Sequence, residues 1–140
     1  MTKLSFFIRF TLIYTLTMAG LGIVFGLLEL ENAGATNFIL LFGVSYWFFH
    51  AYGKNNNLAV ATKEKWPLIG IGLVGSLITT VLLGIPTAMS MAIELEYFLF
   101  ALLITQPLNL LVFVVAYKGA IKTLTQQITH VKVPEVSVNK

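Results

Sequence analysis

Four long apolar runs divide this sequence, and the segments between them are short and polar. The runs cover residues 10–28, 35–53, 66–93 and 97–117, and none of them contains an acidic residue, lysine or arginine. A helix needs about 20 apolar residues to cross the hydrocarbon core of a membrane, so each run is long enough for one crossing. Because the backbone cannot leave polar groups unpaired in lipid, and the alternating strands of a closed barrel are absent, the runs are predicted to be helices.

The charged residues alternate in sign from one connecting segment to the next. Glutamates follow the first run and precede the fourth, whereas the basic residues fall in the other segments. Those nine residues are Lys3, Arg9, Lys54, Lys63, Lys65, Lys118, Lys122, Lys132 and Lys140. Short segments rich in lysine and arginine stay in the cytoplasm. Both termini are therefore predicted to be cytoplasmic, with Glu29, Glu31, Glu94 and Glu96 on the outer side.

These patterns predict one all-α domain over residues 1–140, an integral membrane four-helix bundle. The expected spans are residues 6–28, 35–53, 66–90 and 97–117, and the cytoplasmic tail is residues 118–140. The third run is longer than a crossing requires, so that span is expected to tilt, to bend or to end early near Pro86. The segment from Lys54 to Lys65 is expected to be a polar inner loop.

The tail carries its own helical pattern. Apolar residues recur at spacings of three or four at Ile121, Leu124, Ile128 and Val131. This period predicts a short amphipathic C-terminal helical extension, which either continues the fourth span into the cytoplasm or lies on the membrane surface. Pro134 is expected to end it.

The composition agrees with a membrane protein and excludes several other classes. The chain is 57% hydrophobic and 11% charged, whereas soluble domains carry about 25% charged residues. The net charge of +3 lies in span flanks and forms no stripe, so nucleic acid is not an expected partner. The lysines can instead attract anionic lipid headgroups. The absence of cysteine excludes disulfides and thiolate metal sites.

The first run could alternatively be a signal peptide, with Ala33–Ala35 as a cleavage site of small residues. Its apolar stretch exceeds the roughly 7–15 residues typical of such a peptide, so a retained span is preferred.

Small residues recur on one face of two spans. They are Thr15, Ala19, Gly22 and Gly26 in the first span, and Gly72, Ser76, Thr80 and Gly84 in the third. Such faces let helices approach closely in lipid. Spans one and three are therefore expected to pack together within the bundle. The alternative is that such a face binds a second copy of the chain or another membrane protein.

The fourth span contains a polar group around a proline. Gln106 and Asn109 are three residues apart and share a helical face, and Pro107 removes one backbone hydrogen bond. The two amides are expected to point into the bundle, because hydrocarbon offers them no partner. They are predicted either to bond a neighbouring helix, with Thr79 or Thr80 as partners, or to form a small intramembrane site.

No pattern for catalysis, a cofactor or a metal is evident. His50 and His130 are far apart in sequence, and a metal site needs three or four ligands, so neither is expected to bind metal. No lysine, arginine, aspartate or glutamate falls deep within a run, which argues against a proton-coupled pump. The protein is therefore expected not to be an enzyme and to need no cofactor.

The inner loop carries a resemblance. Phe48-Phe49-His50, followed by Thr62-Lys63-Glu64, resembles a group of small uncharacterised four-span bacterial inner-membrane proteins. The resemblance covers the four-span plan and this loop, with lysines and asparagines where the group has arginines. It implies the fold and a bacterial cytoplasmic membrane, but no mechanism.

Taken together, the sequence predicts a small non-catalytic membrane protein of accessory, regulatory or immunity type. It would act through helix or loop contacts with a membrane-protein partner or with itself. The alternative is a minimal oligomeric transporter or channel, with the Gln106–Asn109 face lining the path.

Overall fold

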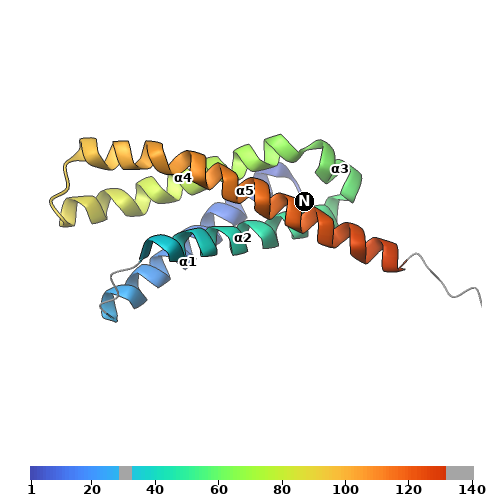
Figure 1. The fold of residues 1–140 in the computed structure, drawn as a ribbon, viewed down its shortest axis with the longest axis horizontal. Coiled ribbons are helices and arrows are strands. Elements are labelled where there is room, and N and C mark those ends of the chain that lie inside the picture. The colour runs from blue at the N-terminus through green and yellow to red at the C-terminus, as the bar shows by residue number, and fades with distance from the viewer. Residues whose placement is uncertain (29–32, 132–140) are drawn as a thin grey trace, which may run out of the picture.

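The computed structural model describes residues 1–28 and 33–131, and these residues form an all-α bundle of four main helices (Figure 1). The helices are α1 (Lys3–Leu27), α2 (Ala33–Asn56), α3 (Leu58–Lys63), α4 (Lys65–Ser90) and α5 (Leu95–Val131). The remaining helix, α3, is short and lies inside the segment for which the sequence predicted a loop. Asn57, with a φ of 71°, turns the chain between α2 and α3, and asparagine tolerates this left-handed conformation better than most residues.

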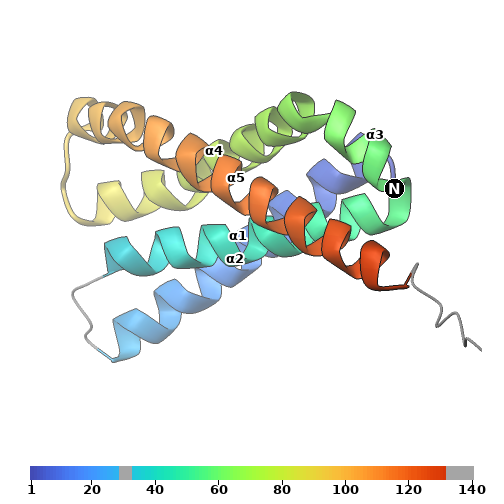
Figure 2. The same ribbon diagram turned by 45° about the vertical axis from the view of Figure 1, so that its right-hand side comes forward.

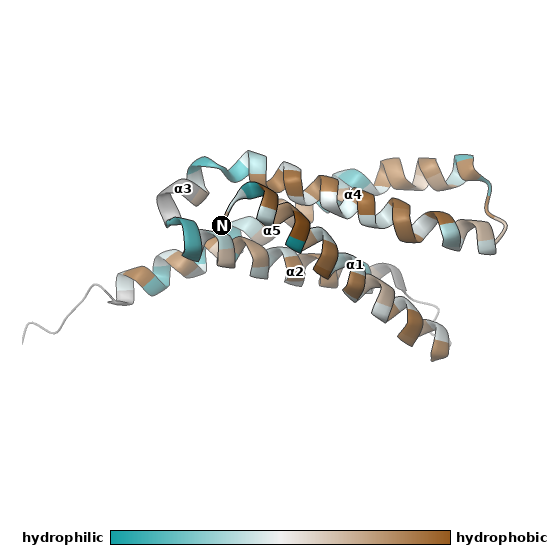
Figure 3. Ribbon diagram, turned by 180° about the vertical axis from the view of Figure 1, so that it is seen from behind, coloured by the Kyte–Doolittle hydropathy of each residue, from teal (hydrophilic) through white to brown (hydrophobic). Residues whose placement is uncertain are grey.

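The main helices form two hairpins, α1 with α2 and α4 with α5 (Figure 1). The hairpins lie together at the end that holds α3 and the N-terminus, and they diverge toward the opposite end (Figure 2). We call these the inner and outer ends of the bundle. Hydrophilic residues gather around α3 and the N-terminus, and apolar residues dominate the long helices (Figure 3).

Three of the helices are long and apolar enough to cross a membrane, namely α1, α4 and the Leu95–Thr129 part of α5. They indicate a multi-pass membrane protein. The other main helix, α2, does not reach the same mean hydropathy because Asn37, His50 and two tyrosines interrupt its apolar residues.

The core lies at the inner end and is largely aromatic. In α1 the buried residues are Phe6, Phe10 and Tyr14, all in its first half. The Phe6 ring stacks on that of Phe10 at 6.0 Å, and the Phe10 ring meets that of Phe113 in α5 at 5.8 Å. Phe49 of α2 also contacts Phe113, at 6.2 Å. Such ring pairs add to the energy of close packing, so this cluster joins the two hairpins.

Two helix ends bear on the expectations from the sequence. α4 continues through Pro86 to Ser90, the residue at which the third span was expected to end, so an end at Pro86 itself is not the alternative taken. α5 continues from the fourth apolar run into the tail, which is one of the two alternatives expected for the helical extension. Leu124 of this extension is buried, and its methyl group would contact any Cβ placed on Gly53 of α2. Packing against α2 therefore holds the extension to the bundle.

Candidate functional site

Gln106 and Asn109 lie on α5 with their amides inside the protein. Asn109 is 3% exposed. Its Oδ1 and both amide atoms of Gln106 are buried and find no hydrogen-bond partner in the part of the chain that the structure describes. The helix runs on through Pro107 between them. A buried polar atom without a partner costs about 1–3 kcal/mol, so a structural role alone does not explain these amides.

The expected threonine partners are engaged elsewhere. In the antiparallel α4–α5 hairpin, Gly72 faces Phe113 and Gly84 faces Phe98, which places Gln106 and Asn109 opposite the stretch from Ser76 to Thr80. The hydroxyl groups of that stretch donate to carbonyls of their own helix, Thr79 to Gly75 at 3.0 Å and Thr80 to Ser76 at 2.9 Å. This back-bonding is common for serine and threonine within helices. It leaves the amides of Gln106 and Asn109 without the hydrogen bonds to Thr79 or Thr80 that the sequence suggested.

Two more unpartnered hydroxyl groups come from the other hairpin. Thr11 Oγ1 of α1 and Ser45 Oγ of α2 are buried and have no hydrogen-bond partner among the described residues. The hairpin also has polar contacts that are satisfied, since the Tyr14 hydroxyl donates to Asn37 Oδ1 at 2.8 Å. The bundle therefore contains buried polar atoms with unused bonding capacity on three helices, and each could bond water or a small polar ligand.

The small residues of α4 are close-packed, but mostly against α5. A Cβ placed on Gly72 would lie 2.7 Å from Phe113, and one on Gly84 would lie 2.6 Å from Phe98. Ser76 is buried and Thr80 half-buried. The contact with α1 instead uses Gly75, which sequence reasoning missed and which faces Thr11 and Phe10. α1 and α4 therefore pack together as expected, but through Gly75 and Thr79, whereas Gly72 and Gly84 are turned toward phenylalanines of α5.

The small residues of α1 divide into a packed part and an open part. Thr15 and Thr79 share a hydrogen bond of 2.8 Å between α1 and α4, and Ala19 is half-buried. Gly22 and Gly26 are exposed, and a Cβ on either would meet nothing within 4 Å. The expected packing of these two glycines inside the bundle is thus wrong, because the hairpins diverge before α1 reaches them (Figure 2).

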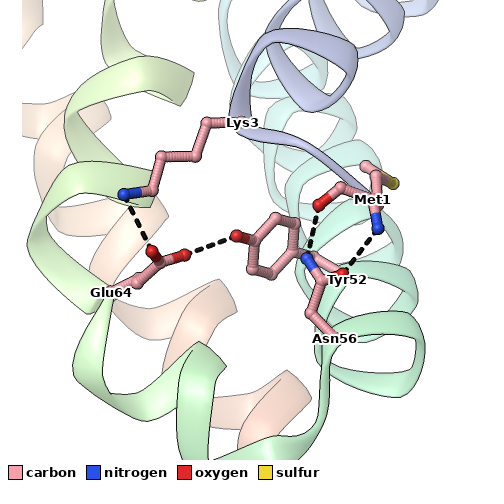
Figure 4. A network of polar contacts seen from close by, with 5 residues as sticks. All are labelled: Met1, Lys3, Tyr52, Asn56 and Glu64. Atoms are coloured by element: carbon pink, nitrogen blue, oxygen red, sulfur yellow. Dashed lines mark hydrogen bonds and ion pairs between the residues drawn. The ribbon is translucent and has the colours of Figure 1, made fainter.

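A polar network ties the N-terminus to the inner end (Figure 4). The Lys3 ammonium pairs with Glu64 Oε1 at 2.8 Å, and the Tyr52 hydroxyl donates to Glu64 Oε2. The N-terminal amine of Met1 donates to Asn56 Oδ1, and Asn56 Nδ2 donates back to the Met1 carbonyl. Sequence reasoning missed this network, although Glu64 is the single acidic residue of the basic inner segment.

The contacts of Glu64 in this network determine its charge. The hydrogen bond from the Lys3 ammonium, followed by that from the Tyr52 hydroxyl, holds the pKa of the Glu64 carboxyl below its ordinary value of 4.5. The carboxylate is therefore charged at neutral pH, and it links α1, α2 and the start of α4.

The remaining candidates stay apart. His50 stacks on Tyr46 with ring centroids 6.4 Å apart, and the side chain of His130 lies outside the described residues. Glu94 and Glu96 are exposed at the outer end, while Glu29 and Glu31 lie outside the described residues. Within residues 1–28 and 33–131, no group of three histidine or acidic side chains is placed to hold a metal ion.

Comparisons of this chain with protein-family models, with curated proteins and with solved structures found no match.

Proposed function

We propose that this protein is a four-span protein of a bacterial cytoplasmic membrane, with both termini in the cytoplasm. The three candidate spans support this topology if α2 crosses as the fourth. α2 has no acidic residue, lysine or arginine before Lys54, and its polar Tyr14–Asn37 contact is satisfied inside the bundle. The placement of lysines and arginines supports a cytoplasmic inner end.

Reporter fusions test this topology. Alkaline phosphatase fused after Lys140 should be inactive, and the same reporter inserted at residues 32–34 should be active. An active fusion at Lys140 would reject the proposed orientation.

We further propose that the protein is not an enzyme but an accessory, regulatory or immunity-type protein that binds another transmembrane helix. The observation that carries this proposal is the open space beside Gly22 and Gly26. In lipid, helices associate through close backbone approach at small residues, because the hydrophobic effect gives no drive between them. Among the residues that the structure describes, none lies within 4 Å of a Cβ placed on either glycine, so this face is open to a helix of a second copy or of a different membrane protein.

Site-specific crosslinking tests this contact, and the absence of native cysteine makes every introduced thiol unique. A benzophenone attached to Gly22→Cys or Gly26→Cys should give a discrete adduct in native membranes. Val24→Cys is the matched control, because Val24 is exposed at the same depth but lies on the opposite side of α1.

The adducts separate the possible partners. An adduct of twice the chain mass indicates self-association, and a different mass indicates another protein, which mass spectrometry identifies. Gly22→Leu should abolish the adduct formed from Gly26→Cys while leaving the fold intact. Equal labelling patterns at Gly22, Gly26 and Val24 would reject the contact.

The second candidate function is transport or ligand binding within the bundle. The buried unpartnered amides of Gln106 and Asn109 favour it, since polar groups at membrane depth often mark pathways or sites. Because these amides lie inside one copy, they support a site within the bundle more than a path between copies.

A further inference from the structure

An apolar groove runs between α2 and α5 on the outside of the bundle. It has a volume of about 360 Å³ and is lined by Phe38, Phe42, Leu108, Leu111, Val112 and Val115. Small-molecule sites in proteins span roughly 300–1,000 Å³, so this groove suits one narrow apolar chain. Leu111 is 62% exposed and Val115 49% exposed, so the groove opens away from the protein.

The α5 wall of the groove leads directly to two cations. Leu111, Val115, Lys118 and Lys122 follow one another at spacings of four, three and four, which places them in one row along the helix. Both lysines are exposed. Neither has an ion-pair partner among the residues that the structure describes.

The α2 wall ends in an aromatic bridge at the same level. Phe42 stacks on Tyr46 with ring centroids 6.1 Å apart. The Tyr46 hydroxyl donates to Thr123 of α5 at 2.9 Å, and its ring would contact a Cβ on Gly119. Tyr46 thus joins the two helices one turn inward from the apolar lining, where the environment changes from apolar to basic.

We propose that this groove binds one acyl chain of an anionic phospholipid, with the lipid phosphate held by Lys118 and Lys122. α5 is one of the helices that can cross a membrane, so the occupant of an apolar groove on its surface is a hydrocarbon chain. The two unpaired ammonium groups at one end of the groove match an anionic headgroup, and lysine side chains readily extend to headgroup level. The inference rests on membrane insertion of α5 and is independent of the partner contact proposed at α1.

Quenching of tryptophan fluorescence by brominated lipids tests the site. The protein would carry Trp47→Phe and Trp66→Phe to remove its native tryptophans, and Phe42→Trp as a probe in the groove. Vesicles of phosphatidylcholine would contain increasing fractions of dibrominated phosphatidylglycerol or of dibrominated phosphatidylcholine. Leu111→Trp is a second groove probe in case Phe42→Trp does not fold.

The groove probe should be quenched at a lower fraction of brominated phosphatidylglycerol than of brominated phosphatidylcholine. Replacing Lys118 or Lys122 by Gln should reduce this preference, by about fivefold for each lysine at low salt. Lys63→Gln is the control variant, since Lys63 lies in α3 and is not part of the row. It should leave the preference unchanged.

A probe away from the groove distinguishes lipid binding in the groove from a general enrichment of anionic lipid around the protein. Leu12→Trp lies on the exposed side of α1 and should be quenched equally by both lipids. Equal quenching of the groove probe by both lipids, or an equal preference for phosphatidylglycerol at Leu12→Trp, would overturn the proposed site. An absence of quenching at Leu12→Trp would overturn membrane insertion itself, which distinguishes failure of the topology from failure of the groove.

Discussion

The hydroxyl oxygens of Thr15 and Thr79 lie 2.8 Å apart and form a hydrogen bond between α1 and α4. Thr79 is buried, and its hydroxyl also reaches the Gly75 carbonyl. This pair lies near the level at which the buried part of α1 ends, because Tyr14 is the last buried residue of that helix. It therefore ties α1 to α4 just beyond the last buried residue of α1.

A double-mutant cycle of Thr15→Val and Thr79→Val should measure this bond. Hydrogen bonds between membrane helices contribute about 0.6 kcal/mol on average, so a coupling energy of that order is expected. Reversible unfolding in mixed detergent micelles gives the free energies. Thr17→Val is the control, because Thr17 is exposed and its hydroxyl donates within α1, to Ile13. A coupling energy of zero would mean that the two hydroxyl groups do not bond in the membrane.

Gly72 should tolerate no larger side chain. The Cβ of Gly72→Ala would lie 2.7 Å from the buried ring of Phe113, and overpacking of this kind costs about 1–3 kcal/mol. Gly22→Ala is the matched control, since its Cβ would meet nothing. Phe113→Leu combined with Gly72→Ala should cost less than the two changes summed. Equal stability of the two alanine variants would contradict the α4–α5 contact described here.

Replacement of Ala92 by glycine should stabilise the protein. The φ of Ala92 is 53°, and this residue closes the C-terminus of α4 with hydrogen bonds from Ala92 N–H to Met89 and from Ile93 N–H to Ala88. This motif usually has glycine at the left-handed position. Ala92→Gly should therefore stabilise the protein by roughly 1 kcal/mol. Ala101→Gly, within α5, should have the opposite effect, and a loss in both variants would show that Ala92 is not left-handed.

The buried amides of Gln106 and Asn109 should lower the free energy of unfolding of the protein. Asn109→Leu and Gln106→Met approximately keep side-chain shape and remove polar atoms that lack partners among the described residues. Each should stabilise the protein by about 1–3 kcal/mol in detergent unfolding. If the amides bind a ligand, the cellular phenotype of the protein should be lost at matched expression. Variants that are less stable than the parent would show that the amides are satisfied, for example by water.

The Glu64 network should make stability depend on pH at the acidic side. Its carboxyl pKa lies below the ordinary 4.5 because Lys3 and Tyr52 stabilise the charged form. The stabilisation is therefore complete above that ordinary value and is lost as pH falls through the lowered pKa. Glu64→Gln should be less stable than the parent at pH 7, and thermal unfolding in detergent should show the two converging below about pH 4.5. Glu96→Gln, at an exposed position, is the control, and its stability should change with pH in the same way as that of the parent. The same result for Glu64→Gln would rule out the ion pair.

The sequence alone determined the helical class and the positions of the long helices. Length and hydropathy suffice for this, because a backbone in lipid must satisfy its hydrogen bonds within each helix whatever its neighbours are. The breaks at the glutamate pairs and at the lysine-rich inner segment are local features, and they were sufficient to place the ends of α1, α4 and α5 to within a few residues. The burial of Asn109 also follows from local chemistry, since an amide avoids hydrocarbon.

Only the tertiary structure decided which faces meet. A row of small residues permits close approach, but the rotation of the helix selects the partner. The rings of Phe113 and Phe98 lie against Gly72 and Gly84, and Phe10 lies against Gly75, so aromatic residues distant in sequence set that rotation. The same holds for the open space beside Gly22 and for the pairing of Lys3 with Glu64. These features depend on how two hairpins cross, which is a property of the packed aromatic core and not of any single span.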